Sequence, residues 1–244
     1  MNDEYYLTEE EQLRREIEKE EKKRLKKEAR YRWRWPRRAL YIGIGIILVF
    51  FLIAYIEGKS GAQQRKPVIY LYPKETTEVF VRLEHKGELT TTYPAYSDGW
   101  RVIAEPDGTL TDAAGMTYNY LYWEGKSATR YDFATGFCVK GSDTAEFLEK
   151  ALSELGLTRR EANEFIVYWL PLMENNRYNV ISFQTKAYTE GAELIISPEP
   201  DTMIRVFMAW YGSNKPVNIK AQELTAPERK GFTVVEWGGS ECAP

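Results

Sequence analysis

Four acidic residues stand beside aromatic residues in the sequence and could do acid–base chemistry: Asp98, Asp132, Glu164 and Glu236. An apolar neighbour can raise the pKa of a carboxylate, and a pair of carboxylates can then serve as acid and base in glycoside hydrolysis. Residues 39–244 contain 26 Asp and Glu, so that such neighbours also arise by chance. Each of the four therefore has a plainer interpretation as a solvated or turn-capping carboxylate.

The chain has one histidine, His85, which limits its catalytic chemistry. Nucleophilic catalysis by Ser or Cys needs a histidine base. His85 precedes Lys86-Gly87 at the expected end of a strand, where we interpret it as a surface residue. The sequence contains no nucleophile elbow, phosphate loop or dinucleotide fingerprint, so no cofactor is expected. One histidine and two cysteines cannot supply a familiar zinc site, so no metal is expected.

Three tyrosines alternate in one predicted strand: Tyr118, Tyr120 and Tyr122. Alternate residues of a strand share one face of its sheet. An exposed aromatic face can bind sugars or peptides, whereas a covered one belongs to the core. We take the three as candidate ligand-binding residues and leave the core interpretation open.

The two cysteines are Cys138, in an apolar run, and Cys242, near the end of the chain. In an oxidising compartment a bridge between them would close a long loop. A lone cysteine in an apolar strand is more often simply buried. A Cys138–Cys242 disulfide is therefore one of two alternatives.

Strand and turn patterns alternate along the C-terminal part of the chain. Glycine pairs such as Lys86-Gly87 supply the backbone angles of hairpin turns and predict an antiparallel meander in the first half of the domain. The predicted strands are 68–72, 78–84, 88–93, 100–105, 116–123, 178–184, 192–197, 203–210, 217–219 and 232–237.

A pair of helices interrupts these strands. Asp143 with Glu146, and Thr158 with Glu161, have the spacing of capping boxes. Gly156 ends the first helix and Pro171 stops or kinks the second. Strands, two helices and strands again predict an α+β domain over residues 66–244, with a mostly antiparallel sheet and the helices on one face.

Three stretches resemble a family of uncharacterised bacterial proteins: KPVIYLYP at 66–73, EFIVYWLP at 164–171 and RKGFTVVEWGG at 229–239. The resemblance spans residues 66–239. It implies a bacterial source and one recurrent domain, often placed after an export or anchoring segment. It carries no assigned activity, ligand or catalytic residue.

Residues 39–56 form an uncharged apolar run that predicts a transmembrane helix. At about 1.5 Å per residue the run rises roughly 27 Å, close to the ~30 Å hydrocarbon core of a bilayer. Lys and Arg are frequent in residues 22–38 and sparse in residues 57–72, which predicts a cytoplasmic N-terminus and a C-terminal domain outside the cell membrane. A buried helix and a signal peptide cleaved near Ser60-Gly61-Ala62 are the alternatives.

The N-terminal residues 1–38 are predicted to form a charged cytoplasmic helix, and residues 57–65 a polar linker. Residues 1–38 hold 13 Lys/Arg and 10 Asp/Glu, with Glu–Lys/Arg pairs four residues apart such as Glu18 and Lys22. The basic residues 22–38 could lie against anionic inner-leaflet lipid. The rest of the chain holds 20 Lys/Arg and 26 Asp/Glu, which argues against a nucleic-acid partner.

Three functions remain open from the sequence. The first is a non-catalytic, membrane-anchored module that binds a protein or cell-wall partner. The second is a carboxylate-dependent hydrolase of envelope glycan, which would need two carboxylates in one cleft. The third is an assembly scaffold that acts through its tail and membrane helix, where Ala39 and Gly43 form a small-xxx-small pair.

Overall fold

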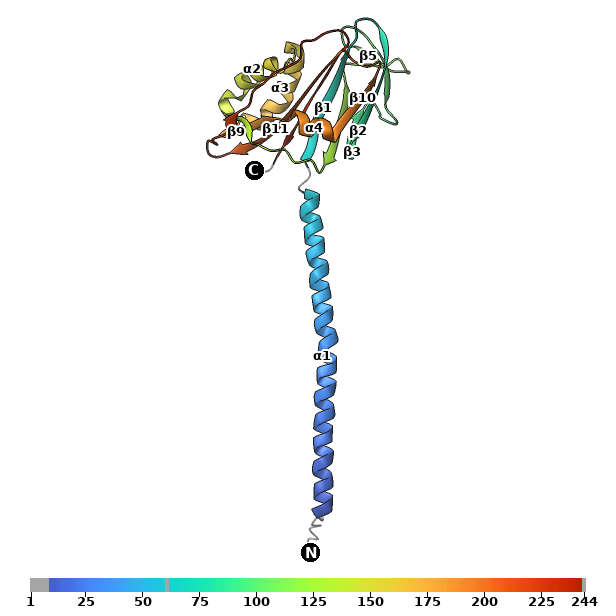
Figure 1. Cartoon of the computed structure of the whole chain (residues 1–244), viewed down its shortest axis with the longest axis vertical. Helices are drawn as coiled ribbons and strands as arrows, with labels where there is room; N and C mark the ends of the chain where they lie inside the picture. The colour runs from blue at the N-terminus through green and yellow to red at the C-terminus, as the bar shows by residue number, and fades with distance from the viewer. Residues whose placement is uncertain (1–8, 60–61, 243–244) are drawn as a thin grey trace. The chain divides into compact units, whose positions relative to one another are not determined.

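The computed structural model describes residues 9–59 and 62–242, without the side chains of 32–39, 52–59 and 62. The chain divides into two compact units, Met1–Lys59 and Ser60–Pro244. The first unit contains the helix α1 (Glu9–Lys59). The second contains every other helix and strand that is described (Figure 1).

The charged part of α1 is helical, as predicted. Lys22 Nζ lies 3.1 Å from Glu18 Oε1, so this predicted pair is formed. Arg24 pairs with Glu28 at 3.6 Å instead of with Glu20. Both pairs are exposed, and such pairs stabilise a helix by only about 0.2–0.5 kcal/mol. The structure does not describe Thr8 or the side chains of the basic segment at 32–38, which includes Arg32.

The predicted membrane helix needs correction. Among the side chains that are described, no helix is long and apolar enough to cross a membrane. Residues 39 and 52–56 of the predicted span lie outside the described side chains. This finding contradicts the predicted single-pass topology and the predicted cell-membrane location.

An eight-stranded sheet forms the centre of the second unit. Most neighbours are antiparallel, but β11 pairs in parallel with β13, and β12 with β8. In spatial order its strands are β12 (Lys220–Ala221), β8 (Thr135–Lys140), β9 (Tyr178–Phe183), β11 (Thr202–Ser213), β13 (Thr233–Glu241), β1 (Ala62–Tyr72), β7 (Leu121–Ser127) and β3 (Gly87–Tyr93).

A second, five-stranded antiparallel sheet holds the rest of the strands described. The order is β10 (Ala192–Ser197), β2 (Thr77–His85), β4 (Trp100–Ala104), β5 (Leu110–Thr111) and β6 (Thr117–Tyr118). The predicted meander is therefore split, because β3 follows β2 in the chain but joins the larger sheet.

Two helices cover one face of the large sheet (Figure 1). They are α2 (Thr144–Glu154), which follows the short 3-10 turn Gly141–Asp143, and α3 (Arg159–Met173). Thr158 and Glu161 form the predicted capping box at the start of α3, whereas Asp143 makes no side-chain cap at α2. Pro171 lies inside α3, which continues to Met173.

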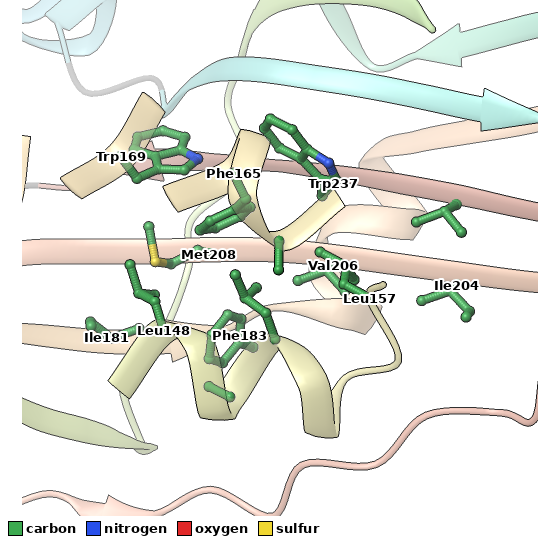
Figure 2. Packing of buried hydrophobic residues seen from close by; sticks show 14 of the residues in the cluster. Leu148, Leu157, Phe165, Trp169, Ile181, Phe183, Ile204, Val206, Met208 and Trp237 are labelled. Atoms are coloured by element: carbon green, nitrogen blue, oxygen red, sulfur yellow. The ribbon is translucent and has the colours of Figure 1, made fainter. Parts of the chain in front are cut away.

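Apolar side chains fill both sides of the large sheet. On the helix side, Phe165 and Trp169 of α3 pack with Trp237 of β13 and Met208 of β11 (Figure 2). On the other side, a second cluster joins the large sheet to the five-stranded sheet and includes Tyr188 of α4 (Thr185–Gly191). The predicted α+β class and the helices on one face are confirmed. The second sheet as a separate layer, β8 and α4 were not predicted.

Candidate functional site

The four candidate carboxylates occupy different settings. Asp98 and Asp132 are exposed in loops, where they accept hydrogen bonds from Ser97 Oγ at 3.0 Å and from the Ala134 amide at 3.0 Å. Glu164 lies on α3 and accepts the hydroxyl proton of Tyr70 at 2.7 Å. Glu236 is fully buried in β13. The structure therefore places the four in two exposed loops, on α3 and in the buried strand β13.

Glu236 is the centre of a buried polar network. Arg205, its register partner on β11, donates to Glu236 Oε2 from Nε and Nη2, each at 2.7 Å. Trp123 Nε1 donates to Oε1 at 3.1 Å, and Arg205 Nη2 also donates to the Ala192 carbonyl. Burial opposes the charge of Arg205, but Glu236 and Tyr188 outweigh it and raise the pKa of the guanidinium. Both carboxylate oxygens of Glu236 thus accept hydrogen bonds within the fold, which gives this residue a structural role.

A second ion pair fixes the start of α3. Glu161, which is fully buried, completes the capping box by accepting the Thr158 amide proton at 2.7 Å. The Arg229 guanidinium pairs with both oxygens of Glu161 and donates to the Gly156 carbonyl. Arg229 therefore ties the long segment before β13 to the turn between the two helices.

His85 is half-buried rather than a free surface residue. Its ring lies 5.2 Å from that of Trp123, Nε2 lies 3.2 Å from the Lys126 carbonyl oxygen, and Nδ1 is buried without a hydrogen-bond partner among the described residues. Burial lowers the pKa of His85, against the opposing pull of the Lys126 and Gly191 carbonyls. His85 therefore packs on Trp123 beside a backbone carbonyl, and among the described residues no hydrogen bond joins it to a serine, threonine or cysteine.

This setting predicts a pH effect on stability. Because the pKa of His85 is lower in the folded chain than the ~6.5 of an unfolded one, its contribution is fully present above pH ~6.5 and is lost as pH falls below that value. The loss should be modest, because the ring is half-exposed and solvent screens its charge. Urea unfolding at pH 7.5 and 5.0 checks this: His85→Gln should show a smaller loss than the unsubstituted chain. Equal losses would assign the pH dependence to other groups.

The two cysteines are free thiols in separate contacts. Cys138 Sγ accepts a hydrogen bond from the Val217 amide at 3.2 Å, while Cys242 Sγ lies 3.7 Å from the Ser240 carbonyl. Burial raises the pKa of the Cys242 thiol. The disulfide alternative is not formed. Among the described residues, no group of three or more His, Cys, Asp and Glu side chains is placed to hold a metal ion.

A tyrosine-lined pocket of about 540 Å³ opens where β3, β6 and the start of β7 meet. Tyr93 is 61% exposed, and its ring meets that of Tyr118 edge-on with centroids 5.4 Å apart. Asp112 holds Tyr118 through a 2.8 Å hydrogen bond from the phenol. The lining residues combine aromatic rings with neutral polar groups: Tyr93, Thr109, Thr117, Tyr118, Asn119 and Tyr120.

The alternating tyrosines do not share one face, as the sequence suggested. Tyr118 belongs to the five-stranded sheet and packs toward the core between the sheets, whereas Tyr120 and Tyr122 pack toward the helix side of the large sheet. All three are partly exposed. The predicted strand 116–123 is in fact two strands, β6 and β7, and the break between them places Asn119 and Tyr120 at the pocket.

Beside this pocket lies the Lys66 cluster, which we define as Lys66, Tyr120, Tyr122, Glu124 and Tyr168. Lys66 Nζ donates to Tyr120 Oη at 3.3 Å and stands 5.0, 5.2 and 6.0 Å from the ring centroids of Tyr120, Tyr122 and Tyr168. Cations are attracted to ring faces at such distances. The Lys66 amide donates to Glu124 Oε1 at 3.1 Å.

Lys66 adopts an unusual backbone conformation. Its φ of 57° is in the left-handed region, which costs a non-glycine residue about 1–2 kcal/mol. The register of β1 shifts here against both neighbours, β13 and β7, so Lys66 lies in an irregularity of the strand. Strained residues of this kind concentrate at functional sites. In the sequence this position is marked by Lys66-Pro67, which opens the first family-like stretch.

Sequence reasoning found part of the pocket and missed the rest. Tyr118 and Tyr120 were candidates and line it, whereas Tyr122 lies in the Lys66 cluster. Thr117 and Asn119 adjoin these tyrosines in the chain, whereas Tyr93 and Thr109 come from two other segments, and none of the four was a candidate. Only the pairing of β3 with β7, where Tyr93 stands opposite Tyr122, brings Tyr93 to the site.

Comparison with known proteins gives one informative match. No family model matches the chain. No solved structure matches it either. An uncharacterised protein from the bglA 3' region of Butyrivibrio fibrisolvens is 40% identical over 90 residues, which cover 34% of this chain and 93% of the relative. The chain therefore belongs to the same family as this uncharacterised protein.

Proposed function

We propose that the second unit is a non-catalytic binding module whose tyrosine-lined pocket takes a sugar unit of a carbohydrate chain. The pocket is the observation that supports this most directly. Its volume of about 540 Å³ falls within the ~300–1,000 Å³ of small-molecule sites, which combine aromatic walls with a few placed polar groups.

The chemistry of the lining fits a sugar ring. The C–H faces of a sugar pack against the flat faces of tyrosines, and Tyr supplies such area at a low entropic cost. Asn119 and the hydroxyls of Thr109 and Thr117 offer neutral donors and acceptors for sugar hydroxyls. Tyr118 is held by Asp112, so that part of the wall is already arranged before a ligand arrives.

The three family-like stretches are also part of this proposal. Residues of all three family-like stretches meet beside the pocket: Tyr70 donates to Glu164, Lys66 lies over Tyr168, and Arg229 pairs with Glu161 next to Tyr72. Gly108, beside Thr109 of the pocket, has a φ of 90°, and a Cβ there would lie 2.6 Å from the Tyr72 ring. We propose that these stretches form the frame that holds the pocket.

The alternative of a glycan hydrolase has less support. A hydrolase of that kind needs two carboxylates on either side of the scissile bond. The described residues that line the pocket include no Asp or Glu. Glu236 and Glu161 are buried with their oxygens paired, and Glu164 is hydrogen-bonded to Tyr70.

Tyr93→Ala is the sharpest test. Because Tyr93 is 61% exposed, its loss should leave the fold intact and weaken glycan binding roughly tenfold, about 1.4 kcal/mol. Affinity gel electrophoresis of the full chain against immobilised polysaccharides measures this, with circular dichroism to check folding. Tyr31→Ala, at an exposed tyrosine on α1, is the matched control and should bind as the unsubstituted chain does. A folded chain that binds no polysaccharide would contradict the proposal, and a protein partner would then be the next candidate.

A further inference from the structure

The Lys66 side chain is partly buried, and its ammonium has N–H donors without a hydrogen-bond partner among the described residues. An ammonium has three N–H donors, and the hydrogen bond that the structure gives this group goes to Tyr120 Oη. Among the described residues, no carboxylate oxygen lies within 4.0 Å of Lys66 Nζ. Ring faces attract the cation but leave its donors unpaired.

The nearby acids are already engaged. Glu124 accepts the Lys66 amide proton at 3.1 Å. Glu164 accepts from Tyr70 at 2.7 Å, and Arg160 lies 3.9 Å from its other oxygen. Among the described residues, these acids therefore leave donors of the Lys66 ammonium available to a ligand.

The position of Tyr120 connects this cation to the pocket. Tyr120 lines the tyrosine-lined pocket and also receives the Lys66 hydrogen bond, so the ammonium lies one hydroxyl group away from the ligand space. A carboxylate carried by a sugar in the pocket could take the remaining donors of Lys66. Charge-assisted hydrogen bonds of this kind are about twice as strong as neutral ones.

We infer that the pocket selects carboxylated sugars and that Lys66 is the residue that determines this preference. The inference rests on the proposed carbohydrate binding and goes further by naming the ligand class. Long-range attraction of an acidic sugar does not explain this preference, because residues 39–244 hold more acidic than basic residues. The contact is local, and at physiological salt, where charges are screened beyond about 8 Å, the local contact decides.

A purely structural role for Lys66 makes a different prediction. If the lysine only fastened the irregular part of β1, its replacement would change stability and would weaken binding of neutral and acidic sugars alike. Selectivity separates the two roles, because only a direct contact discriminates between a carboxylate and its ester.

The experiment compares each acidic glycan with its own methyl ester. The full chain is titrated with polygalacturonate, alginate and hyaluronan and with their esterified forms, and Kd is measured by calorimetry. At least one acid should bind tenfold or more tightly than its ester. Lys66→Met, which keeps the length of the side chain, should abolish that preference, Lys66→Arg should keep most of it, and Tyr93→Ala should weaken acid and ester alike.

The possible failures are distinguishable. Equal binding of acid and ester by the unsubstituted chain would overturn the inference and leave the carbohydrate module standing. Binding of none of the acidic, esterified or neutral glycans would overturn both. If Lys66→Met does not fold, the comparison of acid with ester on the unsubstituted chain and on Lys66→Arg still decides.

Discussion

Glu236→Gln should destabilise the second unit by about 3–5 kcal/mol, because it leaves the Arg205 charge buried without its counter-charge. Arg205 is 7% exposed and Glu236 fully buried, so water cannot replace the lost partner. The substitution preserves the shape of the side chain, and the cost comes from the charge. Such a loss is a large share of the ~5–15 kcal/mol that holds a typical domain folded. Urea unfolding followed by circular dichroism measures it.

Two further variants separate the pair from its parts. Replacing both partners, Arg205→Met with Glu236→Leu, should restore much of the stability, because an apolar pair of similar volume often equals or exceeds a buried ion pair. Glu84→Gln is the matched control, since Glu84 forms an exposed pair with Arg82 at 3.0 Å and should cost less than about 1 kcal/mol. A loss below 1 kcal/mol for Glu236→Gln would show that water or another group reaches Arg205.

Trp169→Ala should cost about 3–5 kcal/mol, since it empties the space of a fully buried indole in the helix-side core. The ring lies against Phe165 and Tyr168, with centroids 6.1 and 4.9 Å away. It also packs on Gly239 of β13, where a Cβ would lie 2.7 Å from the indole. The free energy of unfolding should be followed by circular dichroism, because the substitution removes a fluorophore.

Trp169→Phe provides the matched comparison. The indole Nε1 is buried without a hydrogen-bond partner among the described residues, so phenylalanine forfeits no hydrogen bond and removes an unpaired N–H. Its cost should be about half that of the alanine variant or less. If the two variants cost the same, the indole N–H has a partner that the structure does not include.

The sequence predicted best where the signal was local. The second capping box, at Thr158 and Glu161, and the alternation in β2 and β10 are read from neighbouring residues, and these elements lie where they were expected. The strand predicted at 217–219 failed, and a short strand at Lys220–Ala221 takes its place. The helix α4 was missed, because Thr185–Gly191 is short and ends in a glycine.

The site was harder to predict, because sequence neighbours do not define it. Lys66 and Tyr168 are a hundred residues apart along the chain and meet only after β1 and α3 pack on one core. Glu236 looked like a catalytic acid beside Trp237, but strand register placed Arg205 opposite it and buried both. Burial and register are properties of the fold, and one sequence does not reveal them.

The predicted membrane helix shows a different limit. Its signal was an uninterrupted apolar run, which depends on length more than on any one residue. Among the described side chains, no helix meets that requirement. The fold and the pocket of the C-terminal unit do not depend on that prediction.

The position of β13 has a consequence for how the unit is made. This strand lies between β1 and β11 at the middle of the large sheet, yet the ribosome produces it after all the other strands described. Until it emerges, β1 lacks the neighbour that separates it from β11, and both cores stay open. Folding of the large sheet is therefore expected to complete only after β13 has been synthesised, with apolar surface exposed to chaperones until then.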